Sequence, residues 1–247
     1  MNYYRRAMTD PAVYGDTWAP IYDAFHTHLD PTATVDALVQ LAGTGKALEL
    51  GIGTGRVAIP LAARGVAVHG IEASRAMLDR MRAKPGGADV AVTLGDFTEV
   101  AVDGEYALIY VVVNTLYGLL TQAAQVACVR NAAARLAPDG VFVVEAFVPD
   151  PARFTANQRV QVNRIESTDL DLLFTRHDPV QQRLASQRVI VGPQGMQQFP
   201  VEIRYVWPTE LDLMAQLAGL RLRERWGDWQ RSPYTGSGKH ISIYERA

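Results

Sequence analysis

The pattern of hydrophobic and polar positions changes once along the chain. Between residues 47 and 147, short apolar runs alternate with stretches in which apolar residues recur at helical spacing. The apolar runs predict strands at residues 47–50, 66–71, 90–94, 106–113 and 141–147. The stretches between them predict helices at residues 57–63, 74–83 and 121–137, with Pro138-Asp139-Gly140 ending the last helix. This alternation indicates a parallel sheet with helices on both faces.

Residues 148–207 have a different pattern. Charged and β-branched residues alternate there with a period near two, and Gly192, Pro193 and Gly195 are typical of hairpin turns. We therefore predict an antiparallel β insert after the fifth strand. A helix at residues 209–217 and strands at 220–226 and 240–244 then complete the α/β pattern, and an amphipathic helix at 32–41 precedes it.

Charge and composition exclude several classes of function. The 247 residues contain 24 Lys and Arg against 26 Asp and Glu, a formal net charge of −2, so a nucleic acid is not the expected partner. The single cysteine, Cys128, excludes an internal disulfide, and no cluster of side chains has the spacing of metal ligands, so we expect no metal. Without a signal peptide or an apolar run of about 20 residues, we expect a cytoplasmic protein with no membrane partner.

The strongest candidate for chemistry is the segment 49–56, which reads Glu-Leu-Gly-Ile-Gly-Thr-Gly-Arg. An apolar strand leads into three alternate glycines, and a helix follows. Glycine allows a tight turn and a close approach of a ligand to the backbone, while the start of the helix offers free N–H groups to an anion. Glu72 ends the next strand, where a carboxylate can accept both hydroxyls of a ribose.

Three interpretations of this segment compete. The glycines could form a tight turn and nothing more. A nicotinamide or flavin site is the second interpretation, but its G-x-G-x-x-G fingerprint would need a third glycine where Arg56 stands. A site for S-adenosylmethionine is the third.

The third interpretation is supported by a family resemblance. The E-L-G-x-G-x-G segment, Glu72 and Gly95-Asp96-Phe97 after the third strand resemble the class I S-adenosylmethionine-dependent methyltransferases. The resemblance implies a Rossmann-like, seven-stranded, mostly parallel sheet with an antiparallel last strand. The aromatic start of the chain and the insert after strand five resemble the layout of family members that tailor small molecules, including sugar and antibiotic amines.

The resemblance divides the single domain into four parts. Residues 1–44 would form an N-terminal helical cap, and residues 45–147 would be the cofactor-binding core. The insert at 148–207 would be a substrate lid, and residues 208–247 would complete the sheet.

The resemblance also implies which residues meet the cofactor. Gly51, Gly53 and Gly55 would pass under its methionyl part, Glu72 would hold the ribose, and Asp96 and Phe97 would bind the adenine. The other residues expected at the cofactor are Tyr14, Trp18, Glu49, Arg56, Ala73, Met77 and Val113. Two of these have alternatives: Arg56 could pair with the cofactor carboxylate or be solvated, and Met77 could pack on the adenine or belong to the core.

Methyl transfer depends mainly on aligning the acceptor with the methyl group. Tyrosine combines an aromatic face that attracts a cation with a hydroxyl that can orient a nucleophile, so the catalytic candidates are Tyr14, Tyr22 and Tyr117. His240, which opens the last strand, is the histidine expected to act as a base. Packing roles for the tyrosines and a structural role for His240 remain alternatives. Asn114, Glu145, Phe147 and the loop 227–239 also belong at the carboxyl ends of the strands, where ligands bind in such sheets.

The sequence thus predicts a methyltransferase that uses S-adenosylmethionine and acts on a small molecule, with an amine of a secondary metabolite as the first expectation. Methylation of oxygen, carbon or sulfur is the alternative, and a non-catalytic cofactor-binding protein is another. The β insert also offers a surface through which a homo-oligomer could form.

Overall fold

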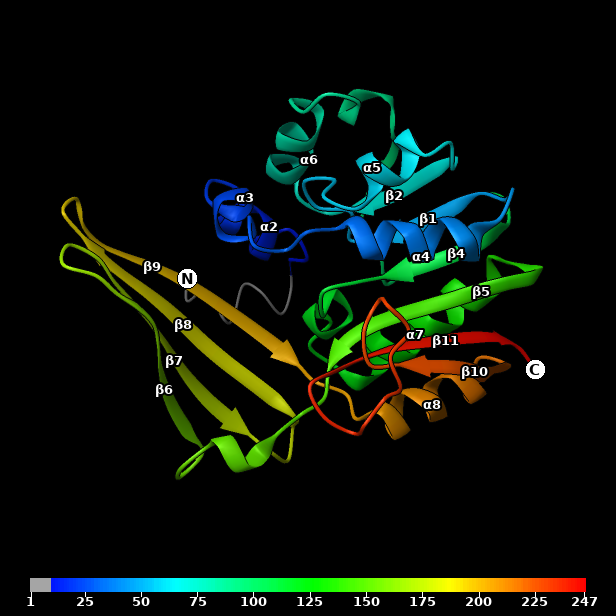
Figure 1. Cartoon of the computed structure of the whole chain (residues 1–247). Helices are drawn as coiled ribbons and strands as arrows, with labels where there is room; N and C mark the ends of the chain where they lie inside the picture. The colour runs from blue at the N-terminus through cyan, green and yellow to red at the C-terminus, as the bar shows by residue number, and fades with distance from the viewer. Residues whose placement is uncertain (1–9) are drawn as a thin grey trace.

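A seven-stranded sheet forms the centre of the computed structural model, which describes residues 10–247 (Figure 1). Its strand order is β10-β11-β5-β4-β1-β2-β3. Five strands are parallel: β1 (Ala47–Leu50), β2 (Val68–Glu72), β3 (Ala91–Leu94), β4 (Tyr106–Val111) and β5 (Leu136–Phe147). The last strand, β11 (Lys239–Arg246), lies antiparallel between β5 and β10 (Leu220–Trp226). The predicted Rossmann-like sheet with an antiparallel last strand is confirmed.

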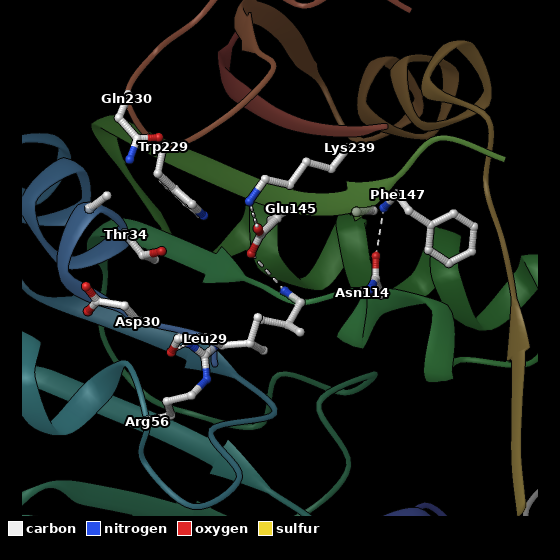
Figure 2. Close-up of a pocket in the computed structure, with 13 residues that line it drawn as sticks. Leu29, Asp30, Thr34, Arg56, Asn114, Glu145, Phe147, Trp229, Gln230 and Lys239 are labelled. Atoms are coloured by element: carbon white, nitrogen blue, oxygen red, sulfur yellow. Dashed lines mark hydrogen bonds and ion pairs between the residues drawn. The ribbon is translucent and has the colours of Figure 1, made fainter. Parts of the chain in front are cut away.

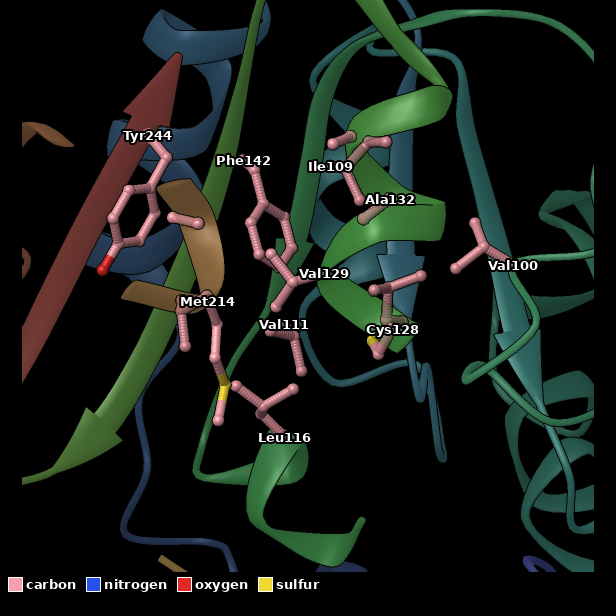
Figure 3. Close-up of a cluster of buried hydrophobic side chains, with 14 of the residues drawn as sticks. Val100, Ile109, Val111, Leu116, Cys128, Val129, Ala132, Phe142, Met214 and Tyr244 are labelled. Atoms are coloured by element: carbon pink, nitrogen blue, oxygen red, sulfur yellow. The ribbon is translucent and has the colours of Figure 1, made fainter. Parts of the chain in front are cut away.

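Helices cover both faces of this sheet. Three of them, α4 (Thr32–Ala42), α5 (Ala58–Ala63) and α6 (Arg75–Arg82), pack on one face, and α7 (Gln122–Ala134) and α8 (Pro208–Leu217) pack on the other (Figure 1). Since both faces are covered, the central strands bury apolar side chains on both sides. Figure 3 shows the cluster on the α7 face, where Phe142, Val111 and Cys128 are fully buried. Each large side chain buried in this way contributes about 1.5–3 kcal/mol.

The predicted antiparallel insert is also confirmed. Four strands form a second sheet in the order β6-β7-β8-β9, with bounds β6 (Gln158–Ile165), β7 (Leu170–Asp178), β8 (Arg183–Gly192) and β9 (Gly195–Arg204). Gly192 pairs with Gly195 across a two-residue turn, and Gly195 has a φ of +105°, which favours glycine. This insert sheet stands beside the carboxyl ends of β1, β4 and β5 (Figure 1).

The two short helices α2 (Val13–Trp18) and α3 (Tyr22–Phe25) lie between the carboxyl edge of the central sheet and the insert sheet (Figure 1). The first nine residues of the predicted N-terminal cap fall outside the described part of the chain. Helix α2 contacts the start of α6 closely: a Cβ on Gly15 would lie 2.4 Å from the Cβ of Ser74. The Ser74 hydroxyl donates to Asp16 at 2.6 Å, which fixes α2 against α6.

The predicted end of the helix before β5 is wrong. Helix α7 ends at Ala134, not at residue 137, and Pro138-Asp139-Gly140 lies inside β5. The cause is pairing with a distant strand. Leu136 already pairs with Tyr106 of β4, whereas the next pair is Val141 with Leu108, so residues 137–140 form an irregularity in the strand.

Strand β4 is shorter than predicted and ends at Val111, because Val113 and Asn114 have φ values of +52° and +63°. Strand β2 begins at Val68, two residues later than expected. Within residues 10–247, none of the helices has the length and apolar character needed to cross a membrane.

Candidate active site

The glycine segment follows β1 as predicted, and its glycines differ in what surrounds them. Gly53 has a φ of +57°, and a Cβ built on it would have no atom within 4 Å, so this glycine borders open space. A Cβ on Gly55 would instead lie 2.8 Å from side-chain atoms of Ile59 and of Met81. Gly55 therefore lets the segment pack against α5 and α6, while Gly53 lets a ligand approach the backbone.

Glu72 at the end of β2 fixes this segment from the side. Its buried carboxylate accepts the N–H of Gly53 and the N–H of Ser74, both at 2.9 Å. Burial raises the pKa of Glu72, and the N–H groups of Ser74, Gly53 and Ala73 oppose that rise. A carboxylate oxygen has two lone pairs, so Glu72 can still accept hydroxyl groups from a ligand beside Gly53.

The turn after β3 lies next to the same segment. Gly95 donates its N–H to the carbonyl of Glu72 at 2.9 Å, and a Cβ on Gly51 would lie 3.6 Å from the Phe97 ring. The carboxylate of Asp96 accepts the N–H of Thr98 at 2.8 Å, which shapes the turn. The structure therefore brings the predicted Asp96 and Phe97 to the edge that holds Gly51 and Glu72.

Glu49 lies beneath the glycine segment and is buried. It accepts the hydroxyl of Tyr110 at 2.9 Å. Burial raises the pKa of Glu49 to about 8, although Tyr110 and the charge of Arg56 lower it. A neutral Glu49 is therefore favoured near pH 7, and a cation bound above it would favour the ionised form.

The cap is tied to this edge by polar and apolar contacts. Asp23 accepts the hydroxyl of Thr54 at 2.7 Å and the ammonium of Lys84 at 2.8 Å. Trp18 packs against Met77, which is 2% exposed, in a small buried cluster. Met77 therefore belongs to the contact between cap and core, which agrees with the packing alternative given for it.

Of Tyr14 and Tyr22, the two catalytic candidates in the cap, Tyr22 is the more enclosed. Burial raises the pKa of Tyr22, Arg56 opposes the rise, and Glu49 and Glu72 add to it, so its hydroxyl lies in the electrostatic field of the glycine segment. Tyr14 stacks on Trp18 with ring centroids 5.9 Å apart and is 40% exposed.

A cavity of about 320 Å³ opens next to Arg56, at the ends of β4 and β5 (Figure 2). It is lined by Leu29, Asp30, Ala33, Thr34, Arg56, Val113, Asn114, Glu145, Ala146, Phe147, Trp229, Gln230 and Lys239. Arg56 and Val113 are the predicted cofactor residues among them. Asn114, Glu145, Phe147 and the loop of Trp229, which were predicted at the carboxyl ends of the strands, also line this cavity. Leu29, Asp30 and Thr34 were not among the predicted site residues.

Glu145 organises one wall of this cavity. Its carboxylate accepts the ammonium of Lys239 at 2.9 Å and the N–H of Val113 at 3.0 Å. Asn114 accepts the N–H of Phe147 at 2.7 Å (Figure 2). A β-branched residue with positive φ is strained by roughly 1–3 kcal/mol, so these bonds hold Val113 in a conformation that it would not adopt alone.

Tyr117 does not line the cavity. Its buried hydroxyl lies 2.8 Å from the carbonyl oxygen of Phe147 and 2.9 Å from that of Val206, toward which it donates. Tyr117 thus joins the end of β5 to the chain that leaves the insert sheet. This arrangement corresponds to the packing role that was the alternative for this residue.

His240 does not line the cavity either. Adjacent strand residues face opposite sides of a sheet, so Lys239 reaches the cavity while His240 is buried on the α8 side. Its Nδ1 lies 2.8 Å from the Ser242 hydroxyl. Burial, together with the charge of Arg225, lowers the pKa of His240 to about 4, so it is neutral near pH 7.

A second cavity of about 250 Å³ lies between the end of β5 and the insert sheet. Phe147, Phe154, His177 and Tyr205 are among its lining residues. His177 contacts the Tyr205 hydroxyl at 2.9 Å and packs on the Phe154 ring with centroids 4.6 Å apart. Phe147 lines both cavities.

Nowhere in residues 10–247 do three His, Cys, Asp or Glu side chains gather as metal ligands.

These features fit S-adenosylmethionine. The open space at Gly53 admits a ligand against the backbone, Glu72 offers acceptors to ribose hydroxyls, and Arg56 offers a cation to a carboxylate. Tyr22 and Glu49, which interact electrostatically beside the glycine segment, would offer an aromatic ring and an acidic group to its sulfonium.

Comparison with known proteins gives the same assignment. Residues 47–140 match the family model described as a methyltransferase domain. The chain is 37% identical to the CcbJ methyltransferase of Streptomyces caelestis, with a TM-score of 0.90 and coverage of 96% of this chain and 99% of that one.

Two further matches extend the comparison. The cypemycin N-terminal methyltransferase of a Streptomyces species is 28% identical over 96% of this chain and 98% of its own length. The fold is shared with the amino pentose methyltransferase CalS10 of Micromonospora echinaspora, whose structure holds S-adenosylmethionine, at 21% identity and a TM-score of 0.68 over 90% of this chain and 96% of that one. The chain belongs to the S-adenosylmethionine-dependent methyltransferases.

Proposed function

We propose that this enzyme methylates an amine of a small-molecule natural product. The observation that carries this proposal is the likeness to the cypemycin N-terminal methyltransferase, a protein named for its action at an N-terminus. That likeness covers 96% of the chain and so includes the cap and the insert sheet, the two parts that surround the space beside the cofactor edge.

The cofactor supplies an activated methyl group on its sulfonium. The protein therefore has to hold the acceptor in line with that group, and positioning alone can supply about 7–11 kcal/mol of the rate enhancement. In this proposal Glu72 and the Gly53 backbone hold the cofactor, and Tyr22 covers it. A neutral amine brings its own lone pair and needs little help from a base, which suits a site in which His240 is turned away from the cavity.

The acceptor would occupy the space between the central sheet and the insert sheet. The second cavity lies there and combines aromatic walls, Phe147 and Phe154, with polar groups on Arg153, His177 and Tyr205. Such a mixture fits a small molecule that carries both rings and polar substituents. The insert at residues 148–207 would thus act as the substrate lid, and residues 45–147 as the cofactor-binding part.

Matched acceptors test this proposal. The enzyme would be incubated with S-adenosylmethionine and with pairs of compounds that differ only in an amine or a hydroxyl, including amino sugars and short peptides with a free α-amine. We expect S-adenosylhomocysteine to form, and the acceptor to gain one methyl group, with the amine member of at least one pair. Gly53→Val is the control that should abolish both signals. Methylation of hydroxyl members alone, or no turnover with any pair, would contradict an amine acceptor.

A further inference from the structure

Helix α3 is too short to hold its own orientation. It consists of a single turn, Tyr22–Phe25, and none of its four residues is buried. A single helical turn is unstable by itself, because forming it fixes several dihedral angles for little hydrogen bonding. The direction in which its side chains point must therefore be set by contacts with the rest of the molecule.

Asp23 supplies such a contact with the core. Its carboxylate accepts the Thr54 hydroxyl at 2.7 Å and the Lys84 ammonium at 2.8 Å, and the same ammonium donates to the Thr54 carbonyl at 2.9 Å. The three residues thus close a ring of hydrogen bonds between the cap, the glycine segment and the chain that follows α6. Thr54 is 1% exposed, so the cap is anchored to a fixed point of the core.

The ionised state of Asp23 suits this anchoring. Burial tends to raise the pKa of Asp23, but the hydrogen bonds from Lys84 and Thr54 outweigh it and lower that pKa, so Asp23 is ionised near pH 7. The side chains of Lys84 and Asp23 are 32% and 38% exposed, and an ion pair in such contact with solvent contributes little to the free energy of unfolding. The ring of bonds therefore fixes geometry more than it adds stability.

The residue next to this anchor is Tyr22. Its hydroxyl lies within the electrostatic reach of Glu49, Glu72 and Arg56, which surround the glycine segment. Successive residues of a helix point about 100° apart, so holding Asp23 also sets the direction of Tyr22. An aromatic ring attracts a sulfonium cation, whereas it has no such attraction for the neutral sulfur of S-adenosylhomocysteine.

We propose that Asp23 is a positioning residue, which by binding Thr54 and Lys84 turns the ring of Tyr22 toward the sulfonium of S-adenosylmethionine. This inference deepens the proposed function, since it rests on the placement of Tyr22 over the cofactor, but it does not depend on the acceptor. It predicts that breaking the ring of hydrogen bonds lowers the preference of the enzyme for S-adenosylmethionine over S-adenosylhomocysteine.

The ratio of the two affinities tests this prediction without an acceptor. Calorimetry would measure both affinities for the wild type and for each variant, and melting temperatures would show that each variant is folded. Tyr22→Leu removes the ring and should lower the preference about fivefold, as for one lost cation–π contact. Asp23→Ala and Lys84→Met, which break the ring of bonds from its two sides, should each lower the preference about threefold, a large part of the same contact.

Two comparisons separate positioning from a direct effect of charge on the sulfonium. Asp23→Ala removes a negative charge and Lys84→Met a positive one, so a direct effect would have opposite signs in these variants, whereas positioning lowers the preference in both. Asp23→Asn is the conservative variant. It removes the same charge as Asp23→Ala but keeps an oxygen that can accept the Thr54 hydroxyl, so it should retain more of the preference.

A double substitution completes the test. Asp23→Ala in the Tyr22→Leu background should cause no further loss of preference, because no ring remains to be positioned. A loss of preference in Tyr22→Leu with none in Asp23→Ala and Lys84→Met, or with opposite changes in these two, would overturn this inference and leave the proposed function intact. An unchanged preference in Tyr22→Leu would contradict the placement of Tyr22 in the proposed function as well, and this inference with it.

Discussion

The two sheets of this enzyme contain similar apolar residues but bury them differently. All four residues of β1 are buried, and so are five of the six residues of β4, because helices cover both faces of the central sheet. In the insert sheet, β6 has no buried residue. Val160, Val162 and Phe174 are 62%, 52% and 41% exposed on its outer face.

The central sheet and the insert sheet therefore differ in how strongly packing constrains their residues. The carboxyl edge of the central sheet is fixed because the strands that lead to it are buried. The positions of Gly53 and Glu72 are fixed further by the hydrogen bond between them. The insert sheet is constrained on its inner face, where Phe199 meets the cap. At its base the outer face is also held, because the buried Arg204 bonds to Gln125 and Glu210, but away from the base Val160, Val162 and Phe174 are exposed. Substitutions should therefore act strongly at the central edge, moderately on the inner face of the insert and weakly on its outer face.

The largest effect is expected from Gly53→Val. A side chain there would fill the open space beside Gly53, where we propose that the cofactor binds. We therefore expect affinity for S-adenosylhomocysteine to fall about 100-fold or more, which is about 2.7 kcal/mol. Calorimetry would measure this loss. Gly65→Val is the control, because Gly65 also has a positive φ, +87°, and open space around it, at the other end of α5. Equal losses in the two variants would mean that backbone strain, and not the cofactor space, causes the effect.

Glu72→Ala should weaken cofactor binding about tenfold or more. It removes acceptors for ribose hydroxyls, whose charge-assisted bonds contribute about 1.5–3 kcal/mol each, and it frees the N–H of Gly53. Glu72→Gln, which keeps one acceptor oxygen without the charge, should fall between the wild type and Glu72→Ala in titrations with S-adenosylhomocysteine. An unchanged dissociation constant in Glu72→Ala would remove this residue from the site.

Glu49 predicts a pH dependence of stability in the ligand-free enzyme. Its pKa is raised from 4.5 to about 8 by burial, so between these values the folded chain keeps a proton that the unfolded chain has lost. The contribution of Glu49 to stability is thus fully present below pH 4.5 and declines as the pH rises to about 8, by at most about 1.4 kcal/mol per pH unit.

Glu49→Gln should remove that decline, because the amide does not titrate but can still accept the Tyr110 hydroxyl. Melting temperatures of the two proteins between pH 5 and 8 would test this, with a difference in slope of at most about 3–6 °C per pH unit. Parallel curves would show that Glu49 titrates normally.

The smallest effects separate the two faces of the insert sheet. Phe199 packs on Trp18 with centroids 5.3 Å apart and on Phe25 at 6.2 Å. Loss of about 0.5–1.5 kcal/mol from such a pair should loosen the cap, and we expect Phe199→Ala to weaken S-adenosylhomocysteine about threefold. Phe174→Ala, on the exposed outer face, should change its affinity very little. Equal effects would mean that the insert acts as a whole and not through its contact with the cap.

The central sheet and the glycine segment could be predicted because their signals are local. Continuous apolar runs mark strands that are buried on both sides, and the alternate glycines, Glu72 and Gly95-Asp96-Phe97 each lie within a few residues of a strand end. The end of α7 could not be predicted in this way, because it depends on the pairing of Leu136 with Tyr106, a residue distant in the sequence.

The candidates at the ends of β4, β5 and β11 show a second limit. Sequence reasoning placed Tyr117 and His240 near the edge, and both are there, but their side chains point into the packing. The choice between Lys239 and His240 depends on a register of one residue, which periodicity cannot fix for a short strand. Trp229 was inside the predicted loop, but only the fold shows that its buried N–H has no acceptor among residues 10–247.

Trp18 touches both halves of the molecule, since it packs on Met77 beside the cofactor edge and donates to Pro200 of the insert sheet. A single side chain thereby connects the core helix α6 with the insert sheet. Binding of the cofactor at the proposed site would restrict the motion of Trp18. It would thereby also fix the part of the insert sheet that we propose contacts the acceptor. We therefore expect ordered kinetics, in which the nucleoside enters first and leaves last, and in which S-adenosylhomocysteine inhibits competitively against S-adenosylmethionine but not against the acceptor.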